Sequence, residues 1–166
     1  MPHCHILPGA GPGGCSPIQP GSLRRERTRL RHKENSRTVL VGFTPKPEGY
    51  AALDFAIEQA RAFDEPLIVI NTGIGEQAEE KGVATPSQLE EADRRLRASG
   101  VGYELKQFIR GNDPVDELLA LAESDPQIRL IAIGGRRRSA VGKRIMGSKA
   151  QRIILESAIP VVSVKA

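Results

Sequence analysis

The residues best suited to binding chemistry lie in one stretch of the sequence, from Gly134 to Lys149. Glycines stand near both of its ends, and glycine lets a backbone approach a ligand closely. From Arg129 to Arg152 the chain carries eight Lys and Arg residues and no Asp or Glu. Ser148 stands where a helix is expected to begin, and the free amides and dipole of a helix start favour an anion. The combination predicts a phosphate-binding site. Its expected ligand contacts are Gly134, Arg136, Arg137, Gly147, Ser148 and Lys149.

Each of these residues also has a plainer explanation. Gly134 could end a strand, Gly147 could precede a helix, and Ser148 could be the N-cap of that helix. The arginines could form a solvated surface. The stretch is not a Walker phosphate loop, because the glycine spacing before Lys143 is seven residues and not five, and Arg144 stands where Ser or Thr is required. We favour the anion site because the stretch combines all these features at the expected ligand edge of a sheet.

Catalytic side chains are scarce around this stretch. Residues 37–166 hold no cysteine or histidine, which excludes Cys-His and Ser-His-Asp catalysis and a Cys or His metal site from them. The cysteines and histidines between residues 3 and 15 could be drawn as a zinc site, but their spacing fits no common pattern. The acids closest in sequence, Asp125 and Glu156, lie outside the cationic stretch. We therefore expect no catalytic residue, no metal site and at most weak nucleotide hydrolysis.

The net charge of +4 comes entirely from residues 1–36, which carry six Lys and Arg and two Asp and Glu. Residues 37–166 carry eighteen of each kind and are neutral. Five Pro and five Gly make residues 1–36 poor in core-forming side chains, so we expect a disordered basic tail. The basic run Arg24–Lys33 is explained by solvation, with a contact to nucleic acid or an acidic surface as the alternative. Nucleic-acid binding is not expected elsewhere.

The composition is that of an ordinary globular chain, with 39% hydrophobic and 27% charged residues. No apolar run approaches the roughly 18–20 residues that cross a bilayer. The N-terminal residues contain no apolar stretch of signal-peptide length. We expect no membrane contact and a cytoplasmic location.

Residues 37–166 alternate between short apolar runs and amphipathic stretches, and we expect one α/β domain there. The expected strands are Thr38–Phe43, Pro66–Asn71, Tyr103–Ile109, Ile128–Ile133 and Pro160–Val164. The expected helices are Tyr50–Phe63, Pro86–Ser99, a helix opened by Asn112-Asp113-Pro114, and Ser148–Ser157. In the first helix, the residues spaced as its buried face are Ala51, Leu53, Phe55, Ala56, Ala60 and Phe63.

This order of elements predicts the fold class. Apolar strands separated by helices indicate an open, mostly parallel five-stranded sheet with helices on both faces. In such a sheet the ligand crevice lies at the carboxyl ends of the strands, where the winding reverses. The loops Phe43–Gly49 and Gly134–Gly147 follow the first and fourth strands, so we expect both to border that crevice.

Several motifs in this chain resemble those of the universal stress protein family. The carboxyl-terminal third carries Gly134-x-x-Arg137 followed by nine residues and Gly147-Ser148, then Ala150–Ile153 and Ile159–Val164. The first strand, the helix with Ala51-Ala52-Leu53 and the strand ending at Asn71 are similar to the first half of the family. The resemblance implies a Rossmann-like fold of the adenine nucleotide alpha hydrolase type.

The resemblance also implies a ligand. Nucleotide-binding members carry Gly-x-x-Gly, nine residues, then Gly-Ser or Gly-Thr, which hold phosphates. Gly134, Gly147 and Ser148 match this motif, whereas Arg137 replaces its second glycine and Thr44 replaces an Asp that contacts the adenine end. The expected ligand is ATP or a related adenine nucleotide, with Mg²⁺ as its companion ion. The residues expected to complete the site are Phe43, Thr44, Pro45 and Thr72.

Three functions follow in order of preference. The first is a stress-response binding module that holds ATP or another phosphate-bearing ligand. It forms a homodimer through Pro160–Val164, because the final strand of the family commonly pairs with its counterpart in a second subunit. The second is a protein-interaction module of the same family that binds no nucleotide. The third is a slow nucleotide hydrolase.

Overall fold

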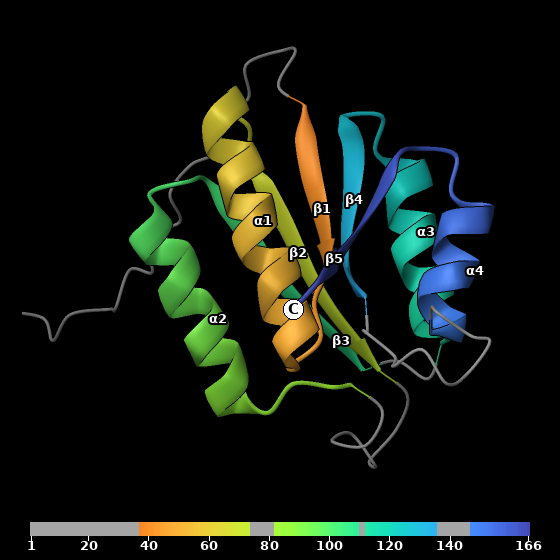
Figure 1. Cartoon of the computed structure of the whole chain (residues 1–166), viewed down its shortest axis with the longest axis horizontal. Helices are drawn as coiled ribbons and strands as arrows, with labels where there is room; N and C mark the ends of the chain where they lie inside the picture. The colour runs from red at the N-terminus through yellow and green to blue at the C-terminus, as the bar shows by residue number, and fades with distance from the viewer. Residues whose placement is uncertain (1–36, 74–81, 110–111, 136–146) are drawn as a thin grey trace, which may run out of the picture.

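The computed structural model describes residues 37–73, 82–109, 112–135 and 147–166. Within these residues, five strands alternate with four helices (Figure 1). The strands are β1 (Thr38–Gly42), β2 (Leu67–Gly73), β3 (Tyr103–Ile109), β4 (Ile128–Gly135) and β5 (Val161–Lys165). The helices are α1 (Pro47–Phe63), α2 (Pro86–Ser99), α3 (Pro114–Ser124) and α4 (Ser148–Glu156). The expected order of elements is confirmed. Residues 1–36, for which we expected a disordered tail, lie outside the described residues.

The strands form one sheet in the order β3-β2-β1-β4-β5, and every pairing is parallel. Helices α1 and α2 cover one face of the sheet and α3 and α4 cover the other (Figure 1). The expected α/β fold, an open parallel five-stranded sheet between two helical layers, is therefore confirmed. The chain winds outward from β1 to β2 and β3, then returns to β4 on the other side of β1. The winding thus reverses between β1 and β4.

The strands are buried because alternate side chains enter two separate cores. Val39, Val41 and Phe43 pack with α1 and α2. Leu40 packs with α3 and α4 on the opposite face, together with Ile131. All five of these side chains are at most 1% exposed. The central strand is therefore held rigidly, which fixes the position of the loop that follows it.

The buried face of α1 differs in part from the expected one. Its buried residues are Gly49, Ala52, Leu53, Ala56, Ile57 and Ala60. Phe63, which we expected to face inward, is 60% exposed, so that prediction was wrong. Ala51 and Phe55 are only partly buried. Phe63 lies in the last turn of α1, and its ring lies 4.8 Å below the guanidinium carbon of Arg129 instead of entering the core.

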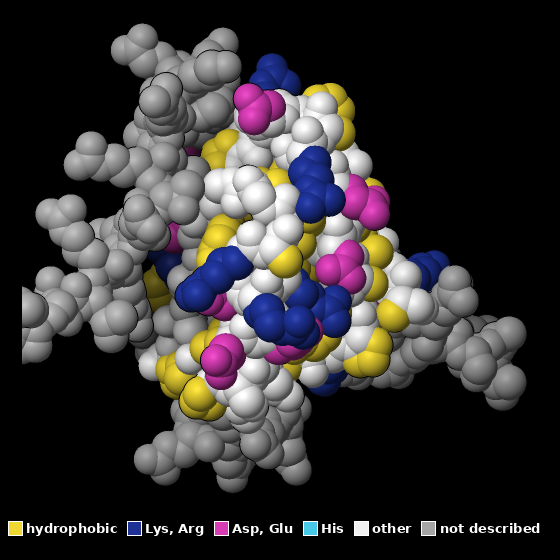
Figure 2. All heavy atoms as spheres, turned by 90° about the vertical axis from the view of Figure 1, so that its left-hand side faces the viewer, with side chains coloured by type: hydrophobic (Ala, Val, Ile, Leu, Met, Phe, Trp, Pro, Cys, Tyr) yellow, Lys and Arg dark blue, Asp and Glu magenta, His cyan; other side chains and the backbone are white. Residues whose placement is uncertain are grey.

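The outer face of α2 is charged but internally neutralised. Figure 2 shows Lys and Arg side chains gathered on this side of the molecule, with Asp and Glu side chains among them. Arg94 and Arg95 both pair with Glu91, and Arg97 pairs with Asp93. Each cation on this helix thus has a carboxylate partner nearby, so we interpret the face as a solvated surface and not as a binding site.

None of the described helices combines the length and apolarity needed to span a bilayer. Nor do the described residues contain a group of three or more His, Cys, Asp or Glu side chains arranged to hold a metal ion.

Candidate functional site

A cavity of about 110 Å³ lies where the winding reverses, at the carboxyl ends of the strands. Strands β1, β2 and β4 and the first two turns of α3 and α4 contribute to its wall. The residues lining it are Gly42, Phe43, Thr44, Ile70, Thr72, Pro114, Val115, Leu118, Ile133, Gly134, Lys149, Ala150 and Ile153. The wall is mainly aliphatic, so it suits a flat apolar ring. Five of the residues predicted as ligand contacts are among these thirteen: Phe43, Thr44, Thr72, Gly134 and Lys149.

Phe43 contributes to the wall mainly through its backbone. Its ring is 1% exposed and belongs to the core under α1 and α2, the layer opposite the cavity. There the ring meets Tyr50 edge to face, with centroids 5.1 Å apart. The apolar contact that the sequence suggested for the Phe43 ring is thus taken up by the core. Pro45, also a predicted contact, is half-buried and lies outside the lining set.

Two threonines supply the hydroxyl groups of the cavity. Thr44 follows β1 and Thr72 lies near the end of the neighbouring strand β2. The Thr44 carbonyl accepts a hydrogen bond from the Lys46 amide at 2.8 Å, which tightens the turn into α1. Neither threonine hydroxyl has a hydrogen-bond partner among the described residues. The Thr44 hydroxyl lies against Gly49 in the first turn of α1, 2.7 Å from where a Cβ on that glycine would be.

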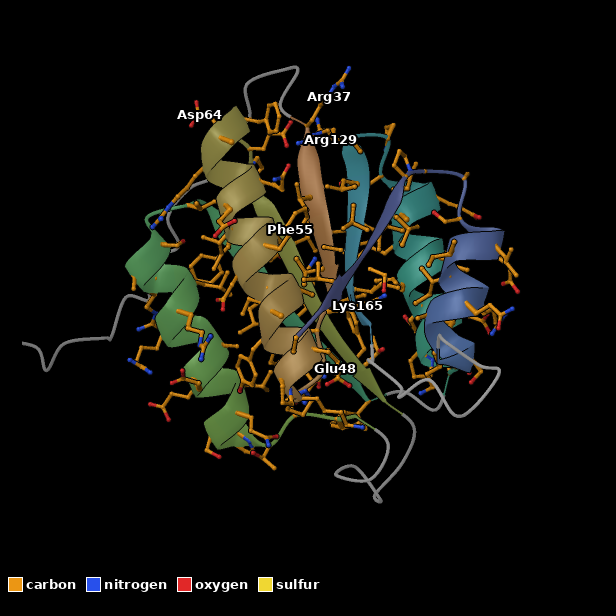
Figure 3. The ribbon with its side chains drawn as sticks, in the orientation of Figure 1. Arg37, Glu48, Phe55, Asp64, Arg129 and Lys165 are labelled. Carbon is orange, nitrogen blue, oxygen red and sulfur yellow. The ribbon has the colours of Figure 1, made fainter. Side chains whose placement is uncertain are left out.

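Gly134 is required by the packing of the fold. A Cβ at this position would lie 2.6 Å from the Glu48 carbonyl oxygen and 2.9 Å from the Gly49 amide nitrogen. The end of β4 therefore touches the first turn of α1, and a side chain between them would push the two backbones apart. Figure 3 shows Glu48 in the first turn of α1, at this end of the sheet. The close backbone approach at Gly134 is thus to α1, and its contact with a ligand stays a prediction.

Gly147, by contrast, stands in open space. No atom lies within 4 Å of the place where its Cβ would be. Its φ of −66° is one that any residue adopts, so the backbone does not demand glycine there. Gly147 is the N-cap of α4, which corrects the alternative in which Ser148 had that role. Space beside a helix start is what an incoming anion needs.

The start of α4 offers unpaired amides. Among the described residues no side chain caps this helix, and none caps α1, whereas Thr85 caps α2 and Asp113 caps α3. The first amides of a helix have no partner within it and carry a partial positive charge. Ser148 and Lys149 are both exposed in this first turn, and Lys149 lines the cavity. The free amides of the helix start and the Lys149 ammonium therefore make this end of the cavity electropositive, which favours an anion.

Two other cations of the predicted stretch, Arg129 and Arg152, lie outside this site. Arg129 lies at the opposite end of the sheet, paired with Glu65 (Figure 3). Arg152 pairs with Glu156, Asp116 and Asp113, and the hydrogen bonds that its guanidinium donates to Glu156 and Asp116 raise the pKa of that guanidinium. The predicted contacts Arg136 and Arg137 lie outside the described residues.

A buried amide that the sequence analysis did not single out fixes the edge next to the cavity. The Asn71 side chain is fully buried and donates to the carbonyls of Phe43 at 2.9 Å and Gly82 at 3.0 Å. It accepts from the Ala84 amide at 2.8 Å and from Gln107 at 3.0 Å. Every donor of this amide is used, so Asn71 joins β1, β3 and the segment before α2. The only signal in the sequence was an amide ending an apolar run.

Comparison with known proteins decides the family. The model of the universal stress protein family matches residues 35–165. The chain belongs to this family. A universal stress protein of Mycolicibacterium smegmatis is 38% identical to it over 127 residues, which cover 76% of this chain and 96% of that protein. The resemblance stated from the motifs is thereby confirmed.

Solved universal stress proteins share the fold. One from Archaeoglobus fulgidus superimposes with a TM-score of 0.64 at 29% identity, covering 78% of this chain and 98% of its own. Another, solved in complex with cAMP, has a TM-score of 0.61 at 23% identity, covering 78% of this chain and 97% of its own. At that lower identity the likeness speaks for the fold alone.

Proposed function

We propose that this universal stress protein is a binding module that holds an adenine nucleotide, such as ATP, in the cavity between β1 and β4. One observation carries the proposal. The cavity joins an aliphatic wall, two free threonine hydroxyls and the uncapped start of α4 with Lys149. The aliphatic wall with its few polar groups matches the base of a nucleotide, and the anion site at the other end matches its phosphates.

The residues present fit the ligand at both ends. Ile70, Val115 and Leu118 provide apolar surface for the base, and Thr44 and Thr72 provide hydrogen bonds. The phosphates would lie at Gly147, Ser148 and Lys149, where a Cβ on residue 147 would enter open space. By sequence, Arg136 and Arg137 belong to the same phosphate region. The solved relative with cAMP shows that a protein of this fold binds an adenine nucleotide.

The proposed role is to bind the nucleotide and not to turn it over. None of the described residues lining the cavity carries a carboxylate or an imidazole, which are the usual general bases. A Mg²⁺ ion accompanying a triphosphate would be held by the phosphates and by water. The cytoplasmic location remains a prediction from the sequence.

The test is isothermal titration of the full chain with ATP and Mg²⁺. We expect binding to the wild type and about tenfold weaker binding, worth about 1.4 kcal/mol, for Gly147→Ala. This variant keeps the fold because nothing lies within 4 Å of the added methyl group. Lys149→Gln should weaken binding several-fold, most strongly at low salt.

Arg94→Gln serves as the matched charge control, because Arg94 lies on the exposed face of α2 and should not affect affinity. Absence of binding by the wild type would exclude the nucleotide and favour the protein-interaction module. Equal loss of affinity in Arg94→Gln and Lys149→Gln would show that the attraction is not local to the cavity.

We also propose that the protein is a homodimer formed through the final strand. Strand β5 stands at one edge of the sheet and pairs only with β4 among the described strands. Val161, Val162 and Val164 on this strand are only half-buried. An apolar edge strand of this kind invites pairing with a second chain.

A further inference from the structure

The hydroxyl oxygen of Ser163 on β5 is buried and has no hydrogen-bond partner within the described part of the chain. The other buried side-chain atom of this kind there, Nη2 of Arg129, still lies 2.7 Å from the Glu65 carboxylate. A buried hydroxyl without a partner costs free energy, so native proteins nearly always pair such a group with protein, water or an ion. The Ser163 hydroxyl is therefore a candidate hydrogen-bond donor to a ligand.

This hydroxyl lies at the ligand edge of the sheet, over the last residue of β4. A Cβ on Gly135 would lie only 2.3 Å from the Ser163 oxygen, so the oxygen occupies the place that a side chain on Gly135 would take. In the sheet, Ser163 pairs with Ile133, which lines the cavity. Neighbouring strands are about 4.8 Å apart, so the hydroxyl lies one strand beyond the cavity wall, on its β5 side.

Strand alternation places Lys165 on the same face of β5 as Ser163. Val161, two residues before Ser163, packs in the core under α3 and α4, and alternate residues of a strand share one face. Lys165 pairs with Gly135 in the sheet and is exposed at the end of β5 (Figure 3). Within the described ranges no carboxylate pairs with its ammonium. A hydroxyl donor and a cation thus lie together on the face that α4 covers.

Helix α4 packs on both β4 and β5, so its start and these two side chains lie on one face of the sheet. The start of α4, with Lys149, is the proposed anion site. Hydroxyl and ammonium groups both donate hydrogen bonds, and those made to a charged phosphate are the strong ones. A single phosphate at the start of α4 would meet Lys149, whereas a longer phosphate chain could continue over the bare backbone of Gly135 toward β5.

We propose that Ser163 and Lys165 form the far end of the phosphate site and bind the terminal phosphates of a nucleoside triphosphate. The site then selects for phosphate chain length and favours ATP over AMP. The inference rests on the proposed function, because it assumes that the first phosphate lies at the start of α4. It goes beyond that function by assigning ligand contacts to β5. Pairing of β5 with a second chain would use its edge backbone groups and leave these side chains free.

Titration calorimetry of the full chain with Mg²⁺ compares ATP with AMP. ATP should bind at least about tenfold more tightly, because only its phosphate chain reaches the charged group on β5. Lys165→Gln should weaken ATP binding about three- to tenfold, most strongly at low salt, and leave AMP binding unchanged. Lys106→Gln is the matched control, since Lys106 lies on the opposite edge strand β3 and pairs with Glu104. It should change neither affinity.

Ser163→Ala distinguishes ligand binding from a structural role. The variant should weaken ATP binding about fivefold, the value of roughly one lost hydrogen bond, and leave AMP binding unchanged. It should not lower the melting temperature of the ligand-free protein, because it removes a buried hydroxyl that has no partner among the described residues. A structural hydroxyl would give the reverse result, with a lower melting temperature and an unchanged affinity for ATP.

The outcomes separate the two proposals. Equal affinity of the wild type for ATP and AMP would overturn the selection for chain length, while the nucleotide site would stand. A Lys165→Gln variant that behaves like Lys106→Gln would overturn the contact from β5. So would a Ser163→Ala variant that binds ATP like the wild type. If the wild type binds neither nucleotide, the proposed function is wrong and this inference falls with it.

Discussion

A methyl group added to Gly134 would lie 2.6 Å from the Glu48 carbonyl oxygen, whereas one added to Gly147 would meet no atom within 4 Å. The two glycines bracket one loop and look equivalent in the sequence. One is needed for helix α1 to pack on β4, and the other leaves room beside the start of α4. Substitution at each position therefore tests a different property.

Gly134→Ala should lower the free energy of unfolding by about 1–3 kcal/mol, because the clash is with backbone atoms that have no side-chain freedom. Gly147→Ala should change it by less than about 0.5 kcal/mol, as is usual for an open surface position. Urea denaturation followed by circular dichroism measures both. Equal stability of the two variants would contradict the close contact between β4 and α1.

Asp64 ends α1 in the left-handed conformation, with φ of 55° and ψ of 45°. Glycine is the residue that adopts this conformation without strain. Asp64→Gly should therefore raise the free energy of unfolding, by at most about 1 kcal/mol, while Asp64→Ala should lower it. Thermal melting of the three proteins checks the order, and a less stable Asp64→Gly would refute it.

At the scale of the residue, the sequence indicated chemistry but not its geometry. Thr44 and Lys149 were predicted as ligand contacts, and both line the cavity. Phe43 was predicted for the same reason, but strand alternation turns its ring into the opposite core. Asn71 could not be singled out, because its four hydrogen-bond partners come together only when three distant segments meet.

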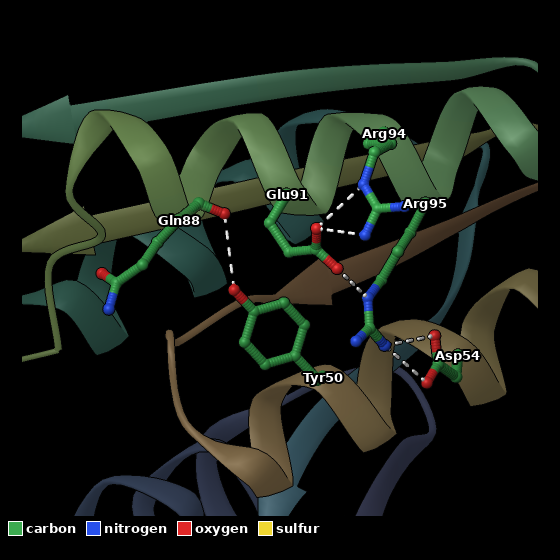
Figure 4. Close-up of polar contacts among 6 residues, drawn as sticks. All are labelled: Tyr50, Asp54, Gln88, Glu91, Arg94 and Arg95. Carbon is green, nitrogen blue, oxygen red and sulfur yellow. Dashed lines mark hydrogen bonds and ion pairs between the residues drawn. The ribbon is translucent and has the colours of Figure 1, made fainter.

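Among the elements, helices α1 and α2 are joined by a small polar network (Figure 4). Arg95 lies 4.7 Å over the Tyr50 ring and donates to both Asp54 and Glu91. The Tyr50 hydroxyl donates to the Gln88 carbonyl at 3.5 Å. Because Tyr50 also packs on Phe43, α2 is linked through α1 to the strand that borders the cavity. The hydrogen bonds and ion pairs of Arg95 are exposed to solvent, so each one contributes little to the stability of the fold.

The ion pair between Glu65 and Arg129 joins the residues before β2 to the start of β4. The Arg129 Nη2 atom lies 2.7 Å from the Glu65 carboxylate, whose side chain is only 9% exposed. Glu65→Ala should destabilise the protein by about 3 kcal/mol, since it leaves a partly buried guanidinium unpaired. The double variant with Arg129→Met should lose less stability than the two single variants lose together. Urea denaturation measures the free energy of unfolding of all three variants. Strict additivity would show that the two side chains do not interact.

Tyr103 on β3 donates to the Asp93 carboxylate of α2 at 2.6 Å. Burial raises the pKa of its hydroxyl above the ordinary 10.0, and the bond to Asp93 raises it further. A raised folded-state pKa gives stability that is present below pH 10 and is lost as pH rises through that folded-state value. Tyr103→Phe should therefore show a shallower decline in urea midpoint between pH 9 and pH 11. Identical declines would contradict a role for Tyr103.

At the scale of the elements, the predicted boundaries depended on local sequence signals such as proline and glycine. Pro86 and Pro114 marked the starts of α2 and α3 correctly, because proline suits the first helical position. Helix α1 also begins at a proline, Pro47, three residues before the expected start at Tyr50. Strands β2 and β4 run two residues further than expected, to Gly73 and Gly135. Their parallel partners Ile109 and Lys165 extend the pairing through glycines, and only neighbouring strands reveal such an extension.

At the scale of the whole molecule, the parallel order of the sheet decides where the site lies. The alternation of strands and helices was enough to predict this architecture and the reversal of winding between β1 and β4. The wall of the cavity comes from residues between Gly42 and Ile153. The site is therefore a property of the complete sheet, and no single segment contains it.

The proposed dimer belongs to the same scale. Sedimentation equilibrium should give twice the mass of the 166-residue chain at micromolar concentration. Val164→Lys should shift the protein toward the monomer, because charge on an edge strand opposes pairing. Its nucleotide affinity should be unchanged, since Val164 does not line the cavity. A wild type that sediments as a monomer would refute the pairing through β5.

Parallel strands also give the molecule two unlike poles. Arg37 precedes β1 at one pole, and Lys165 pairs with Gly135 at the other, beside the ligand edge (Figure 3). A strand of five to eight residues separates the poles by roughly 20 Å. A fluorophore attached after Lys165 would thus sense the polarity of the ligand edge, while the same dye at Arg37 would not. A reporter at Lys165 should therefore respond to the proposed nucleotide, whereas the same reporter at Arg37 should not.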